Sequence, residues 1–150
     1  MMKPLIHKAF AYITYQHKLL IFRHVDDPES GLQVPAGTIK PGERPELGAL
    51  REAQEETGLE GLALIGYLGE QVRDMSDYDK DEIHHRHFYH LHCTNHPPAI
   101  WRHEEPDASE MQGDNPLFEF FWVALPDSVP PLIADHGAML AVLIERLKGS

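Results

Sequence analysis

Cysteine is nearly absent from this chain, since Cys93 is the only one among 150 residues. A single thiol forms no intrachain disulfide and excludes a zinc site built from cysteines. Apolar runs are short as well, because no stretch approaches the roughly 20 apolar residues that span a bilayer. The first residues, MMKPLIHKAF, lack the apolar core of a secretory signal. These features predict a soluble, cytoplasmic protein without a transmembrane segment.

Basic residues are also few. The chain has 13 lysines and arginines against 24 aspartates and glutamates, which gives a formal net charge of -11. This balance argues against a surface that grips the phosphates of nucleic acids, because such surfaces are normally basic. A small phosphorylated ligand is compatible with it if metal ions bridge ligand and protein. The length fits a single domain, residues 1–150, with one core.

The N-terminal part of the chain predicts a β-hairpin. Residues 8–15 and 19–23 are rich in β-branched and aromatic side chains, and the polar residues 16–18 between them are typical of a turn. A turn-rich loop follows over residues 24–31, and residues 32–35 then form a short extended segment.

A helix is predicted from residue 43 or 44 to residue 57. Pro45 suits the first turn of a helix, and Leu47 and Leu50 recur on one face. Gly58 stands where a C-terminal stop is expected. This segment has the clearest helical pattern in the chain.

Downstream, the pattern predicts further strands and a C-terminal helix. The expected strands cover residues 62–69, 84–93 and 116–125, and the helix covers residues 135–148. The acidic residues 73–82 and the proline-containing residues 94–116 have no period and predict loops. This order of elements indicates an α/β protein with a mixed β-sheet flanked by helices.

The predicted helix carries carboxylates in an unfavourable arrangement. In the segment REAQEETG, Glu52, Glu55 and Glu56 are three and four positions apart and share one side of the helix. Each such pair costs about 0.2–0.5 kcal/mol of helix stability in water. A solvated acidic face is the ordinary explanation for a glutamate-rich helix. The alternative is a divalent cation, because converging carboxylates form the hard oxygen site that magnesium prefers.

The surrounding residues favour the cation. Residues 37–59 read GTIKPGERPELGALREAQEETGL. This segment resembles the Nudix box, G-x5-E-x7-R-E-U-x-E-E-x-G-U with U aliphatic, at every fixed position and without a gap. Ala53 fills one aliphatic position, and the preceding VPAG is similar to the strand and turn that enter the box in that family.

The resemblance implies a Nudix fold, in which a mixed β-sheet is sandwiched between α-helices (α/β/α). It also implies hydrolysis of a nucleoside diphosphate linked to another moiety, with Mg2+ or Mn2+ as cofactor. The family pattern makes Glu43 the residue that orients Arg51 and the loop. The implied metal ligands are the Gly37 carbonyl and the side chains of Glu52, Glu55 and Glu56.

Many Nudix proteins use a further acid outside the box as a ligand or general base. We expect Glu119, in the strand FEFFW, to fill that role here. Glu110 and Asp114 in the predicted loop are competitors. Without such an acid, Glu52 itself is the candidate base.

Five histidines crowd one predicted strand. Alternation places His84, His90 and His92 on one face, whereas His85 and His87 face the other way. Zinc binding needs at least three histidines close together on one face, which the spacing along a strand provides poorly. A structural or solvent-facing role is therefore favoured, with contact to a substrate phosphate or base as the alternative.

The sequence indicates a broad class of substrates. A nucleotide, a nucleotide sugar and a dinucleoside polyphosphate all fit, because no subfamily signature stands downstream of the box. A ligand-sensing Nudix module without turnover is an alternative, although such modules typically lose box carboxylates and this chain retains them. An RNA pyrophosphohydrolase is another alternative, which the acidic charge disfavours. The sequence is compatible with a homodimer but does not indicate which edge of the sheet would pair.

Overall fold

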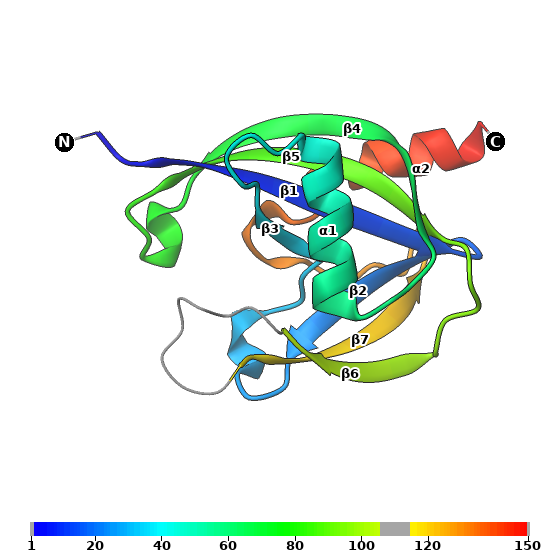
Figure 1. The fold of residues 1–150 in the computed structure, drawn as a ribbon. Helices are drawn as coiled ribbons and strands as arrows, with labels where there is room; N and C mark the ends of the chain where they lie inside the picture. The colour runs from blue at the N-terminus through cyan, green and yellow to red at the C-terminus, as the bar shows by residue number, and fades with distance from the viewer. Residues whose placement is uncertain (1, 106–114, 150) are drawn as a thin grey trace.

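The computed structural model describes residues 2–105 and 115–149. Within these residues seven strands form one sheet, in the order β4-β5-β1-β2-β7-β6, with β3 pairing beside β1 (Figure 1). The sheet is mixed, because β1 and β5 run parallel whereas the other pairs are antiparallel. The strands are β1 (Leu5–Tyr15), β2 (Lys18–His24), β3 (Ala36–Thr38), β4 (Leu62–Asp74), β5 (Ile83–Cys93), β6 (Ile100–Glu104) and β7 (Leu117–Ala124).

Two α-helices, α1 (Pro45–Thr57) and α2 (Leu140–Lys148), cover opposite faces of this sheet. Ala49 and Ala53 of α1 pack on one core together with Ala9 and Ala11 of β1, and these small side chains let the helix approach the sheet closely. Leu143 of α2 belongs to a second core on the other face. The predicted mixed sheet between helices is therefore confirmed. Neither helix of the described residues has the length and apolar character needed to cross a bilayer.

Several elements agree with the sequence. The hairpin β1-β2 turns at Gln16 and His17, which both adopt positive φ. The central helix covers residues 45–57, and Gly58 ends it in the left-handed conformation at φ 75°. Glycine adopts this conformation without steric cost, so it is a natural helix stop.

Other predictions were wrong in part. Residues 100–104, expected to lie in a loop, form β6, a short strand that pairs with β7 at the edge of the sheet. Its five residues alternate between exposed and partly buried and lack the apolar run that marks an inner strand. The C-terminal helix begins at Leu140 instead of residue 135, after a 3-10 turn over Ile133–Asp135 in which Ala134 has φ 49°. Strand β4 continues to Asp74, and a further 3-10 turn spans Ser76–Tyr78.

A buried histidine gives the fold a predictable response to acid. The Val34 N–H donates a hydrogen bond to Nδ1 of His136 at 3.2 Å, and the imidazole packs edge-on against Phe10. Burial, followed by the positive charge of Arg86, lowers the pKa of His136 to about 3, from an ordinary value of 6.5. Between these values the unfolded chain binds a proton that the folded chain does not, so folding stability falls as the pH decreases through this window.

We expect this residue to make the protein less stable at pH 4 than at pH 7 by on the order of 3 kcal/mol. Urea denaturation at both pH values measures the difference. His136→Asn is the matched variant, because an amide oxygen can accept the Val34 N–H without titrating. The pH dependence of the variant should be smaller, and an unchanged dependence would contradict the assignment.

Candidate active site

Three carboxylates converge at the end of α1 next to β6. Oxygens of Glu52, Glu56 and Glu105 lie within 4.8 Å of one another. Glu52 and Glu56 are one helical turn apart and project to the same side of α1. The Glu56 residue is only 4% exposed, and the Glu52 side chain is 13% exposed. So compact and sheltered a group of acids differs from a solvated face.

The edge strand β6 brings Glu105 to the helix. The Trp101 indole Nε1 donates a hydrogen bond to the Thr57 carbonyl at 2.8 Å, and Nδ1 of His103 lies 2.9 Å from the Glu56 carbonyl oxygen. Both residues thereby satisfy carbonyls in the last turn of α1, which have no partner within the helix. Side chains alternate along an extended chain, so Glu105 follows Trp101 and His103 on the same side.

The backbone of Gly37 lies against the carboxylate group. Strand β3 places it opposite Ala9 of β1. A Cβ atom added at Gly37 would overlap the carboxyl group of Glu52, so only glycine fits while Glu52 keeps this position. The neighbouring Ala36 backbone hydrogen-bonds to Glu56.

Arg51 connects this group to the preceding loop. Its Nε and Nη2 donate to both oxygens of Glu43, at 2.7 and 2.9 Å, and Nη2 also donates to the Thr38 carbonyl at 3.2 Å. Its Nη1 donates to Glu52 at 2.7 Å and to Glu55 at 3.4 Å. A planar guanidinium holds several oxygens in one geometry, so Arg51 ties the loop to the acidic side of the helix.

The electrostatics of the site favour a cation. Burial raises the pKa of Glu56 well above its usual range, and the nearby charges of Glu105 and Glu52 raise it further. Burial also raises the pKa of Glu52, against the effect of Arg51. Glu43 differs, because Arg51 lowers its pKa to about 2. The converging acids therefore carry negative charge at a cost that a divalent cation would offset, and three carboxylates suit a hard ion such as Mg2+.

The family model described as NUDIX domain matches residues 5–143. The chain belongs to the NUDIX domain family. This result confirms the resemblance carried by the box, the predicted fold and the general classification of the chain as a hydrolase. A search of curated proteins gave no match.

Solved structures agree with the family assignment. A UDP-X diphosphatase superposes with a TM-score of 0.65 and 17% identity over 99% of this chain, and this chain spans only 65% of that protein's length. A NUDIX hydrolase from Nitrosomonas europaea gives 0.63 and 19%, covering 98% of this chain and 90% of that one. A bifunctional NMN adenylyltransferase/ADP ribose pyrophosphatase from Francisella tularensis, complexed with AMP and a Mn ion, gives 0.61 and 18%, covering 97% and 42%. At these identities the similarity concerns the fold.

Not every residue predicted from the Nudix box joins the converging group. Glu52 and Glu56 do, with Gly37 beside them. The Glu55 side chain is 37% exposed and contacts Arg51 at the border of the group. The role expected for Glu43 matches its contact with Arg51.

The structure does not bring Glu119 to this site. Along β7, Phe118 and Phe120 point into the core beneath α1, so Glu119 between them points to the opposite face. There it accepts hydrogen bonds from Arg23 and Arg102, at 2.7 and 3.1 Å, which lower its pKa. Glu110 and Asp114 lie outside the described residues.

Glu105 is the site residue that the sequence did not reveal. The segment WRHEE was assigned to a loop, where alternation of side chains has no meaning. If the segment is read as a strand, alternation places Trp101, His103 and Glu105 on one side. This alternation is the sequence feature that could have revealed Glu105.

Proposed function

We propose that this Nudix protein hydrolyses a pyrophosphate bond in a nucleoside diphosphate linked to another moiety, by attack of water on phosphorus, with Mg2+ or Mn2+ as cofactor. The observation that carries the proposal is the convergence of Glu52, Glu56 and Glu105 within 4.8 Å beside Gly37. Glu105 takes the place of the acid outside the box that was expected at Glu119.

The converging carboxylates are the residues that would hold the cation, with Glu55 and the Gly37 carbonyl added by the family pattern. A bound Mg2+ or Mn2+ would supply neutralisation of the diphosphate charge and would lower the pKa of a coordinated water. The Mn ion named with the Francisella tularensis neighbour supports this choice of metal. Arg51 and Glu43 act as positioning residues, because Arg51, held by Glu43, binds both Glu52 and the Thr38 carbonyl at the end of β3.

A cavity lined by Lys8 and Ala36 is the candidate pocket for the nucleotide. It has a volume of about 660 Å³, and none of the carboxylates described above lines it. Lys8 relates the cavity to the acidic group, because its positive charge lowers the pKa of both Glu52 and Glu56. Pockets for small ligands commonly measure roughly 300–1,000 Å³, which includes this one.

Arg86 gives this cavity a preference for anions. The guanidinium lies 4.7 Å from the centroid of Phe10 in a residue only 1% exposed. Its Nε is buried without a hydrogen-bond partner among the described residues. A phosphate oxygen or a carbonyl of a nucleobase would satisfy that donor, while Phe10 and Tyr78 supply aromatic surface.

The names of the structural neighbours support a nucleoside diphosphate as the shared substrate unit. One is a UDP-X diphosphatase and another includes an ADP ribose pyrophosphatase. In both names a nucleoside diphosphate is joined to a further group, and the base differs. The net charge of -11 weighs against long RNA as the substrate.

Turnover of a substrate panel tests this function. UDP-sugars, ADP-ribose, dinucleoside polyphosphates, nucleoside triphosphates and 5′-triphosphorylated RNA are incubated with Mg2+ in 18O-labelled water. We expect a nucleoside monophosphate as one product, with the label on a phosphate. Binding of a nucleotide without any product would identify a sensor module instead, and preference for the RNA would identify an RNA pyrophosphohydrolase.

Removal of divalent ions is expected to abolish turnover and leave the fold intact. The apolar cores on both faces of the sheet contain none of the carboxylates, so folding does not depend on the metal. Activity and far-UV circular dichroism are measured after EDTA treatment and again after addition of Mg2+. Activity should return with Mg2+, whereas unfolding in EDTA or retained turnover would contradict the prediction.

A further inference from the structure

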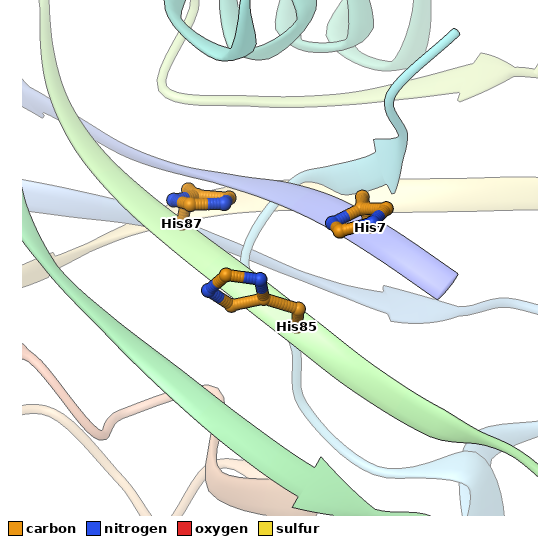
Figure 2. Close-up of side chains that lie close together, drawn as sticks. All are labelled: His7, His85 and His87. Carbon is orange, nitrogen blue, oxygen red and sulfur yellow. The ribbon is translucent and has the colours of Figure 1, made fainter. Parts of the chain in front are cut away.

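Three histidines from two strands form a cluster that the Nudix site does not use. His85 and His87 stand on β5 and His7 stands on the adjacent β1 (Figure 2). One ring nitrogen from each lies within 4.8 Å of the others. The ring centroids of His85 and His87 are 4.4 Å apart, and those of His7 and His85 are 5.5 Å apart.

The parallel pairing of β1 and β5 produces this arrangement. His7 pairs directly with His85, and His87 is two residues further along the same strand, where the side chain returns to the same face. That face is the one covered by α1, because Ala9 and Tyr89, two residues further along their strands, belong to the core beneath the helix. The histidines lie beyond that core, with His7 exposed and the other two partly buried.

A neighbouring side chain orients the His87 ring in the way that is typical of metal-bound histidines. The Tyr67 hydroxyl lies 3.3 Å from Nδ1 of His87 and donates to Glu70 at 3.2 Å. This contact leaves Nε2 of His87 to face a ligand. Metal-bound histidines typically have such a partner on the second nitrogen, which sets the tautomer and the ring direction.

His85 adds a buried nitrogen with no partner. Its Nε2 lies 3.5 Å from the Glu70 carboxylate, but the geometry is not that of a hydrogen bond, and no other described residue hydrogen-bonds to it. Buried polar atoms are nearly always satisfied, so this nitrogen calls for a ligand.

We propose that His7, His85 and His87 form a binding site for a transition-metal dication of the zinc class, separate from the Nudix carboxylates. Three imidazoles suit Zn2+, Co2+ or Ni2+ far better than Mg2+, which prefers oxygen. Tetrahedral Zn–N bonds of about 2.0–2.1 Å place ligand nitrogens roughly 3.4 Å apart, so small ring rotations close the site. Glu70 or a water would complete the coordination.

Isothermal titration with Zn2+ tests the site in the full-length protein, with excess Mg2+ present to occupy the carboxylates. We expect one equivalent to bind. His7→Ala, His85→Ala and His87→Ala should each weaken it at least about a hundredfold, and Glu70→Gln about tenfold. Co2+ provides a second readout, because its visible bands report nitrogen ligands directly and should disappear in the histidine variants.

His17→Asn is the matched control, since His17 is exposed at the hairpin turn and asparagine tolerates its φ of 59°. It should bind Zn2+ like the unsubstituted protein. His7 is exposed, so His7→Ala keeps the test valid if a β5 variant fails to fold. Equal Zn2+ affinity in His7→Ala and the parent, or loss of binding in Glu56→Gln with the histidines intact, would overturn the proposal.

Discussion

Replacing Glu56 with glutamine is expected to lower kcat/KM by about a thousandfold or more. Glu56 is the most deeply buried member of the carboxylate group that it forms with Glu52 and Glu105. Glutamine keeps the shape but removes the negative charge that holds a divalent cation. Loss of metal-assisted charge stabilisation is worth several kcal/mol, and about 4 kcal/mol corresponds to a thousandfold change.

Although Glu56→Gln is expected to lower activity, it should not lower the folding stability of the metal-free protein. The pKa of Glu56 is raised in the folded state, so above the ordinary value of 4.5 the unfolded chain loses its proton more readily than the folded chain. The metal-free protein therefore loses stability as the pH rises above that value, and Glu56→Gln avoids this loss. At pH 8 without metal the variant should be at least as stable as the parent in urea denaturation.

Gln54→Ala provides the control on the same helix, because the Gln54 side chain is exposed. Its kcat/KM should stay within about twofold of the parent value, since surface substitutions away from a site have small effects. Turnover by Glu56→Gln within tenfold of the parent would show that the acidic group does not carry the reaction. Inactivity caused by misfolding is recognised by the stability measurement.

The second large effect is expected from Glu105→Gln, which should reduce kcat/KM roughly 10²-fold. Glu105 contributes one of the three converging carboxylates but comes from the edge of the sheet, outside the Nudix box. A ligand or base of this kind typically accounts for a factor of roughly 10²–10⁴. Steady-state kinetics at saturating Mg2+ give the value, and the Mg2+ concentration for half-maximal rate should rise.

Glu119→Gln is the informative partner of that variant. Its carboxylate is bound by Arg23 and Arg102 on the face opposite α1, so its loss should leave kcat/KM within a few-fold of the parent. The two substitutions have the same chemistry, and their sites are close in the sheet, because Glu105 directly follows β6 and Glu119 lies in the neighbouring β7. A larger effect at Glu119 than at Glu105 would restore the assignment made from the sequence and reject the one made from the structure.

Much of the fold follows from local pattern. The hairpin, the helix ending at Gly58 and the strands β5 and β7 have residues whose period and propensity match the element they form. The strand β6 does not, because a short edge strand owes its conformation to pairing with β7 more than to its own residues. The predicted start of α2 was wrong for a related reason, because tertiary contacts hold residues 134–136 in a turn. The Tyr12 hydroxyl donates a hydrogen bond to the His136 carbonyl, and Arg86 donates one to the Ala134 carbonyl.

The sequence by itself determined the family and the acidic side of α1, because Glu52, Glu55 and Glu56 are close along one chain and a helix brings residues four apart together. Only the tertiary structure decided which distant residues join them. Glu105 reaches the carboxylates because β6 docks on the end of α1, and His7 reaches His85 because β1 and β5 are parallel neighbours. Both contacts depend on the pairing of strands that are far apart in the chain. A local pattern of residues does not specify which strands pair.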